Sequence, residues 1–223
     1  MFDAARSRLD AFVDAAFAFA VTLLVTGAGQ AAASSDGGLA SVIGEAPAFL
    51  IGFSLIAMFW HAHVRWRGMA GRGGDTGPAV LLSLALVFLV LLYVHPLRLL
   101  ALSLASALGL GASPGLERGS VRTLFTLYAL GFMLLSGAVA LLFAGVAAKT
   151  DAEPGHRAVA RGEVGIWSLL AAAGGLSLVI AWLTPWPYAA PWVYAALPVL
   201  IGLFVWRHDW TGAEAVKVEP EPL

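Results

Sequence analysis

Residues 78–97 read PAVLLSLALVFLVLLYVHPL, a run of twenty residues that contains no Asp, Glu, Lys or Arg. An α-helix of about 20 apolar residues is long enough to cross the hydrocarbon core of a bilayer. The rest of the chain has the same character, because 60% of its 223 residues are hydrophobic and only 12% are charged. Its mean hydropathy is +0.84. We therefore predict an all-α, polytopic membrane protein.

Five further apolar stretches bring the predicted number of transmembrane helices to six. They lie at residues 11–30, 46–64, 122–147, 164–184 and 188–206. Together the six spans predict one transmembrane unit over residues 1–210. The tail that follows, residues 211–223, is acidic and contains Pro, so we expect it to be disordered and cytoplasmic.

A second apolar stretch, residues 99–112, follows the third span after His95, Pro96, Leu97 and Arg98. Proline removes a backbone hydrogen-bond donor and bends a helix. We favour one long, bent helix that leaves the membrane near Arg98. The alternative is a re-entrant piece.

The first span has some features of a secretory signal peptide, because Arg6 and Arg8 precede it and three Ala residues follow at 31–33. However, Asp14 lies inside the apolar run. A run of roughly 20 residues can also cross a bilayer by itself. We expect this segment to be retained as a transmembrane helix.

The distribution of Lys and Arg predicts the orientation of the helices. If the N-terminus is cytoplasmic, ten of the thirteen basic residues lie in cytoplasmic segments, and the outer segments hold Arg98, Arg118 and Arg122. An excess of basic residues marks the cytoplasmic side of a membrane protein. We predict a multi-pass protein of the cell membrane with both termini in the cytoplasm.

Several classes of function find no support in the sequence. The chain has no Cys, which excludes disulfides and thiolate metal sites, and its net charge of −1 gives no reason to expect a nucleic-acid partner. No zinc-protease, phosphate-loop, dinucleotide or serine-hydrolase motif occurs. The segments between the spans are too short for a folded catalytic domain. We expect neither enzyme activity nor a cofactor.

Polar side chains divide the first span into two faces. Asp14 lies on one face, and an ionisable residue inside a span usually has a partner or a function. A rotation of about 100° per residue places an opposite stripe formed by Phe12, Ala15, Phe19, Thr22, Leu23, Thr26 and Gln30. The two Thr hydroxyls also have a purely structural interpretation, which the residues alone favour. In it, each hydroxyl bonds to the carbonyl four residues earlier in its own helix.

The second span ends in a cluster of aromatic and basic residues, FWHAHVRWR at 59–67. Trp and Arg are common at membrane interfaces, so this cluster is typical of an anchor. His61 and His63 point about 200° apart on a helix and cannot easily hold one metal ion together. A haem or metal site here is the alternative. His95 and Arg98 share a face of the third helix, which a snorkelling Arg explains without a function.

The segment RLDAFVDAAFAFAVTLLV at 8–25 resembles the first helix of the transmembrane protein 175 family, the endosomal and lysosomal potassium channels and their bacterial relatives. The family signature is Arg, three residues and Phe-Ser-Asp, followed by an apolar stretch that ends in a segment like Thr-Leu-Leu-Val. Arg8, Phe12 and Asp14 match this signature, and Val13 replaces the Ser.

A second resemblance lies at the end of the second span, where family members have a Trp, a His pair and an Arg. Trp60, His63 and Arg65 match these residues, and Val64 replaces the second His. The third span, with its Pro, is also similar but less specific. The resemblance covers roughly residues 6–100.

This resemblance implies a homotetramer of six-helix subunits in the lipid bilayer, in which the first helix of each subunit lines a central, potassium-permeable cation pore. It places an apolar constriction at Phe19, where the family normally has a branched aliphatic residue, with a permeating potassium ion near Thr22. Leu23 and Thr26 continue the pore lining. The other motif residues would lock the first helix against the second: Arg8, Phe12, Asp14, Trp60, His63 and Arg65.

Two other functions fit the residues without the resemblance. Asp14 is the residue on which a proton leak or a secondary transporter would depend. A His-dependent redox or metal-binding membrane protein would use the available imidazoles: His61, His63, His95 or His208.

Overall fold

The computed structural model describes residues 2–33, 43–110, 118–149, 154–185 and 189–207. Every regular element within these ranges is a helix, which confirms the predicted all-α class. In chain order the elements are α1 (Phe2–Ala33), α3 (Ala46–Ala70), the 3-10 helix η1 (Gly71–Asp75), α4 (Gly77–Ala107), α5 (Arg118–Ala147), α6 (Pro154–Leu183), α7 (Trp192–Ala195) and α8 (Leu197–Arg207).

Five of these helices, α1, α3, α4, α5 and α6, are long and apolar enough to cross a membrane. The predicted sixth span is shorter and is divided into α7 and α8. The 11 residues of α8 rise only about 16 Å, against a hydrocarbon core of about 30 Å. Pro198 explains the break, because its ring would clash with a carbonyl of α7 if one helix continued through it.

The third span is continuous through its proline. α4 includes Pro96 and ends at Ala107, so the described part of the stretch 99–112 extends the same helix and makes no re-entrant turn. This agrees with the favoured interpretation of one long helix. A proline in a membrane helix removes one backbone bond, and neighbouring helices and local adjustments compensate for the loss.

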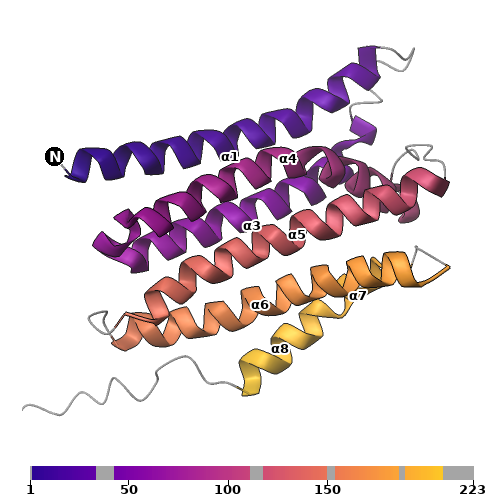
Figure 1. The fold of residues 1–223 in the computed structure, drawn as a ribbon. Coiled ribbons are helices and arrows are strands. Elements are labelled where there is room, and N and C mark those ends of the chain that lie inside the picture. Colours follow the sequence, from indigo (N-terminus) through magenta and orange to yellow (C-terminus); the bar gives the residue numbers. More distant parts are fainter. Residues whose placement is uncertain (1, 34–42, 111–117, 150–153, 186–188, 208–223) are drawn as a thin grey trace, which may run out of the picture.

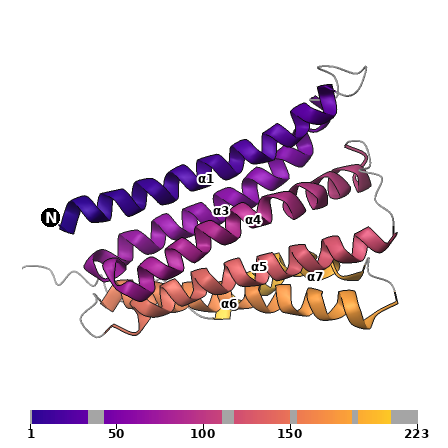
Figure 2. The ribbon, with the colours of Figure 1, turned by 45° about the horizontal axis from the view of Figure 1, so that its top comes forward.

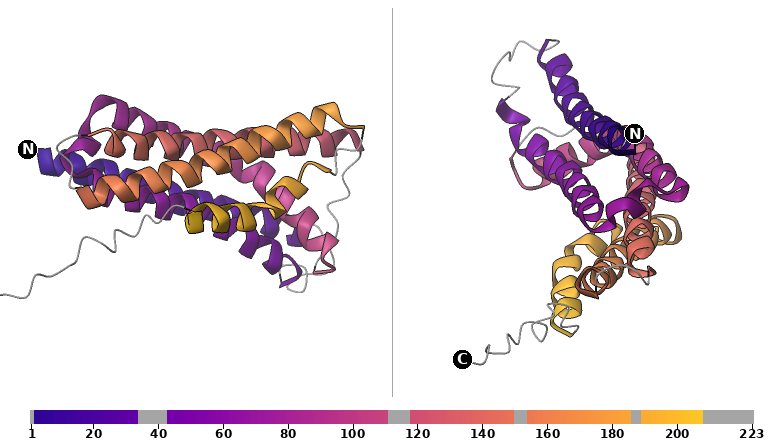
Figure 3. Two further views of the ribbon diagram at one scale, coloured as in Figure 1. Left: turned by 90° about the horizontal axis from the view of Figure 1, so that it is seen from below. Right: turned by 90° about the vertical axis from the view of Figure 1, so that its left-hand side faces the viewer.

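The long helices run side by side in a bundle in which α1 occupies one edge (Figures 1 and 2). α3 and α4 lie next to α1, α5 follows, and α6 with α8 occupies the opposite edge. The turn η1 joins α3 and α4 at one end of the bundle. The end view in Figure 3 shows α1 and α8 on opposite sides of the molecule.

The core of the bundle joins its two halves through aromatic rings. Phe59 of α3 contacts Phe132 of α5 and Trp167 of α6, with ring centroids 5.9 and 5.5 Å apart. All three side chains are buried. This cluster fixes the position of α3, which together with α4 supports α1. The predicted tail, residues 211–223, lies outside the described residues.

Candidate pore-lining face of α1

α1 has one buried side and one exposed side. Its buried residues recur every three or four positions, as expected for a helix that packs along one stripe: Val13, Phe17, Ala20 and Leu24. Leu24 reaches Gly52 of α3, where an added Cβ would lie 2.9 Å from the Leu24 side chain. The small residue therefore lets the two helices approach closely in this half of the contact.

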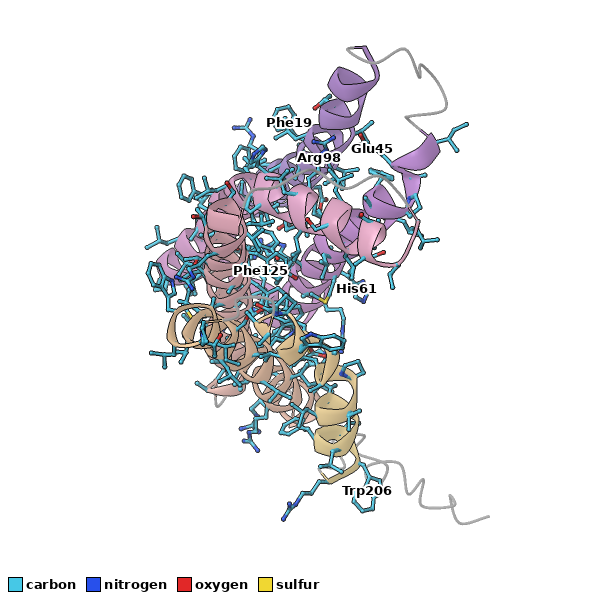
Figure 4. The ribbon with its side chains drawn as sticks, turned by 90° about the vertical axis from the view of Figure 1, so that its right-hand side faces the viewer. Phe19, Glu45, His61, Arg98, Phe125 and Trp206 are labelled. Carbon is cyan, nitrogen blue, oxygen red and sulfur yellow. The ribbon has the colours of Figure 1, made fainter. Side chains whose placement is uncertain are left out.

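The predicted stripe of Phe19, Thr22, Leu23 and Thr26 lies on the exposed side of α1. Phe19 is 54% exposed and Leu23 is 36% exposed. Figure 4 shows Phe19 on the α1 side of the bundle, far in this view from Trp206 of α8. The four side chains are thus available to a pore or to a neighbouring subunit.

Both Thr hydroxyls of this stripe bond to their own helix. The Thr22 hydroxyl donates to the carbonyl oxygen of Ala18 at 3.0 Å, and the Thr26 hydroxyl donates to that of Leu23 at 3.1 Å. This is the structural interpretation that the residues favoured, although Thr26 reaches back three residues and not four. Each hydroxyl oxygen keeps its lone pairs, so it can still accept a hydrogen bond or contact a cation.

Asp14 and Trp60, which come from the two family-like motifs, are brought together by the fold. The indole Nε1 of Trp60 donates to Oδ1 of Asp14 at 2.9 Å and joins α3 to α1. Asp14 therefore has a partner, as an ionisable residue inside a span usually does, although it is exposed in the single subunit. The reason is its place on the wheel, since Asp14 lies beside the buried stripe and not within it.

Arg8 and Phe12 are less closely tied to the bundle than the proposed lock requires. Both side chains are exposed, and Arg8 forms no ion pair with any described residue. The structure therefore places these two motif residues on the free side of α1.

His63 connects α3 to α4 and not to α1. It is buried and lies 3.1 Å from the Ser83 hydroxyl of α4, measured from Nε2 to Oγ. The Ser83 hydroxyl itself donates to the carbonyl of Ala79, so the geometry assigns the donated proton of this pair to His63 Nε2. The ring also packs against Trp66, with centroids 5.2 Å apart.

Arg65 corrects the expected lock between the first two helices. Its guanidinium pairs with the Glu163 carboxylate of α6 at 2.6 Å, and Glu163 also accepts a hydrogen bond from Trp167 Nε1 at 3.0 Å. Arg65 therefore joins α3 to α6. Residues two apart on a helix point about 200° from each other, so Arg65 and Arg67 necessarily face different neighbours.

Arg67, the last residue of the aromatic and basic cluster at 59–67, makes the polar contact to α1 that was expected of Arg65. Its Nε lies 2.7 Å from Asp10 of α1 and its Nη2 lies 2.7 Å from Asp75 of η1. The spacing of two aspartates in the sequence indicated this contact. Asp10 lies four residues before Asp14, so the two carboxylates share a face of α1.

No three His, Cys, Asp or Glu side chains come together as a possible metal site among the residues that the structure describes. His61 is exposed on α3 while His63 is buried, as their spacing predicted. His95 is exposed on α4, and His208 lies outside the described residues.

Comparison with known proteins finds a similarity in the part of the chain that holds this site. Residues 8–96 match the family described as the endosomal/lysosomal potassium channel TMEM175. The first three long helices of the chain are thus similar to that family. The region matched to TMEM175 contains the exposed stripe of Phe19, Thr22, Leu23 and Thr26, the Asp14–Trp60 contact and the Arg67 ion pairs. No curated protein matches the sequence.

A solved structure shows that the TMEM175 likeness in fold extends over the whole bundle. The potassium channel MtTMEM175, as a Thr-to-Ala variant in complex with a nanobody–MBP fusion protein, superposes with a TM-score of 0.73. The match covers 91% of this chain and 93% of that chain, at 21% sequence identity. The two proteins therefore share a fold over most of their length.

Proposed function

We propose that the chain is a subunit of a homotetrameric, potassium-permeable cation channel in which α1 lines the pore and Phe19 forms its constriction. One observation carries this proposal. Phe19, Thr22, Leu23 and Thr26 share the exposed face of a helix at the edge of the bundle, while the opposite face of that helix is buried in its own subunit. The similarity of residues 8–96 to a family of potassium channels supports the same function.

The chemistry of this face suits a pore with an apolar gate. Four copies of α1 around one axis would bring four phenyl rings together, and an apolar ring excludes water and closes a pore by dewetting. Thr22 lies three residues beyond Phe19, about 4.5 Å along the helix. Its hydroxyl oxygen would replace part of the hydration shell of a potassium ion that passes the ring.

Potassium flux into liposomes that contain the purified protein tests this function. We expect flux from the parent protein and a severalfold higher flux from Phe19→Ala, because the smaller side chain widens and wets the constriction. Phe88→Ala is the matched control, since Phe88 is a 66% exposed phenyl on α4. Correctly assembled tetramers without flux, or equal flux from Phe19→Ala and the parent, would refute the proposal.

The contact of Asp14 separates the channel from a proton leak or a secondary transporter. Asn at this position keeps an oxygen that can accept the Trp60 indole hydrogen bond, so the helices stay joined while the titratable group is lost. A channel lined by the Phe19 face keeps its potassium flux in Asp14→Asn. A transporter that carries protons on Asp14 loses its transport.

A further inference from the structure

Arg67 lies where three elements meet at the end of the bundle that holds η1. Its side chain is only 9% exposed, and it pairs through Nε with Asp10 of α1 and through Nη2 with Asp75 of η1, both at 2.7 Å. A cation that is taken out of water needs such partners, because an unpaired buried charge is strongly destabilising. The two aspartates therefore fix the guanidinium in this position.

The turn η1 closes around the same guanidinium. A Cβ added to Gly74 would collide with Nη1 of Arg67, so the backbone of the turn packs directly against the cation. Arg67 cannot move toward the turn. The guanidinium that pairs with Asp10 therefore has a fixed position. At this end of the bundle, the position of α1 therefore depends on a guanidinium that α3 and η1 hold in place.

The contacts of α1 with α3 follow one antiparallel register. Asp10 meets Arg67, Asp14 meets Trp60, and Leu24 meets Gly52 farther along. The first two contacts are polar and directional, whereas the third is an apolar side chain against a glycine. Directional contacts restrain the rotation of a helix about its own axis more strongly than apolar contact does.

The position of Asp10 around the axis of α1 links this restraint to the direction in which Phe19 points. Phe19 follows Asp10 by nine residues, which at about 100° per residue places the two side chains about 180° apart on α1. Thr22 and Thr26 lie about 120° and 160° from Asp10 by the same reckoning. A contact that holds Asp10 toward α3 therefore points this stripe away from its own subunit.

We propose that Arg67 is a positioning residue for the pore, whose ion pair with Asp10 sets the rotation of α1 so that Phe19 faces the channel axis. The inference rests on the proposed function, since it assumes that α1 lines the pore. Asp10 and Arg67 would act on conduction through the direction of Phe19, without contact with the permeating ion.

Arg65 offers a matched control within the same helix. It stands two residues from Arg67 and pairs with Glu163 of α6 at 2.6 Å. This ion pair has a comparable length, but it ties α3 to the opposite side of the bundle. Loss of the Arg65 pair removes a salt bridge of α3 without releasing α1.

The absence of Cys from the chain permits a direct measurement of where position 19 points. We would introduce Phe19→Cys as the sole thiol and measure disulfide cross-linking between subunits in liposomes under mild oxidation. Asp10→Ala and Arg67→Gln are expected to reduce this cross-linking severalfold, because α1 then keeps only the Asp14–Trp60 bond as a directional restraint on its rotation. Asp10→Glu retains a carboxylate and should restore most of it, and Arg65→Gln should leave it unchanged.

The outcomes distinguish this inference from the proposed function. Absence of cross-linking in Phe19→Cys with Asp10 and Arg67 intact would overturn the pore-lining role of α1 itself. Efficient cross-linking that persists in Asp10→Ala would overturn only the positioning role. Asp10→Ala leaves the Arg67–Asp75 pair in place, so the measurement stands even where Arg67→Gln fails to fold. An equal loss in Arg65→Gln would show general loosening of α3 and would also overturn the inference.

Discussion

α1 and the α5–α6 pair represent two ways in which a helix of this chain meets its neighbours. Half of the membrane-spanning part of α5 is buried, against 22% of that of α1, and Ala129, Leu135, Val139 and Phe143 of α5 are each 0% exposed. α1 buries one stripe and leaves Phe12 and Phe19 exposed. The contrast shows that the subunit is built around α5 and α6, whereas α1 is attached at its edge with one face free for other contacts.

Small residues explain the close contact between α5 and α6. An added Cβ at Gly174 of α6 would lie 2.9 Å from the backbone nitrogen of Met133 and 3.0 Å from the carbonyl oxygen of Ala129. In a membrane, helices associate largely through such close packing, since lipid tails are as apolar as the side chains. α1 instead uses an indole–carboxylate hydrogen bond and an ion pair to hold its place.

The largest expected effect compares two phenylalanines in these two settings. Phe143→Ala removes a fully buried ring and should lower the free energy of unfolding by about 3–5 kcal/mol. Phe19→Ala removes an exposed ring and should change the stability of the detergent-solubilised subunit by no more than about 0.5 kcal/mol. Denaturant unfolding of both variants measures the difference. Equal losses would contradict the view that α1 presents a free face.

A second comparison uses two glycines within the α5–α6 pair. Gly174→Ala places a Cβ against the backbone of α5 and should cost about 1–3 kcal/mol of stability. Gly137→Ala on α5 meets nothing within 4 Å, so helix propensity alone applies, a gain of up to about 1 kcal/mol. Thermal unfolding of the two variants gives the sign of each change. A neutral Gly174→Ala would mean that α5 and α6 separate easily.

A smaller effect is expected at Ser177, three residues after Gly174 and near the C-terminal end of α6. The Ser177 hydroxyl donates to the carbonyl of Ala190 at 3.0 Å, directly before α7. Ser177→Ala should cost about 1 kcal/mol, because this buried bond fixes the start of the short terminal helices. Denaturant unfolding measures the loss, and Ser54→Ala is the control, since the Ser54 hydroxyl is exposed and bonds within its own helix.

The smallest effect on stability is expected in the exposed stripe of α1. Thr22→Val keeps the shape of the side chain and removes only a bond to the same helix, so stability should change by no more than about 0.5 kcal/mol. Potassium flux should nevertheless fall, because the oxygen beside Phe19 is lost. A variant with unchanged stability and unchanged flux would remove Thr22 from the pore lining.

The local features of the fold could be predicted from the sequence with good accuracy. The five long helices, the continuity of α4 through Pro96 and the division of α1 into two faces all depend on composition and helical period. These properties repeat every few residues, so a single stretch contains the information. The exposed stripe of Phe19, Thr22, Leu23 and Thr26 was predicted in this way.

The choice of partners could not be predicted in the same way. Arg65 and Arg67 look alike in the sequence, yet one pairs with Glu163 of α6 and the other with Asp10 of α1. The apolar stretch 188–206 likewise predicted the sixth helix but not its form, which is the shorter pair α7 and α8.

The sequence by itself determined which segments enter the bilayer and which side of α1 carries the pore-like residues, because hydropathy and helical period are local quantities. Only the tertiary structure decided that Asp10, Arg67 and Asp75 form one cluster and that Arg65 belongs to a different contact. Those pairings join residues up to 98 positions apart in the chain, such as Arg65 and Glu163. The packing of the helices sets them, and no local pattern records it.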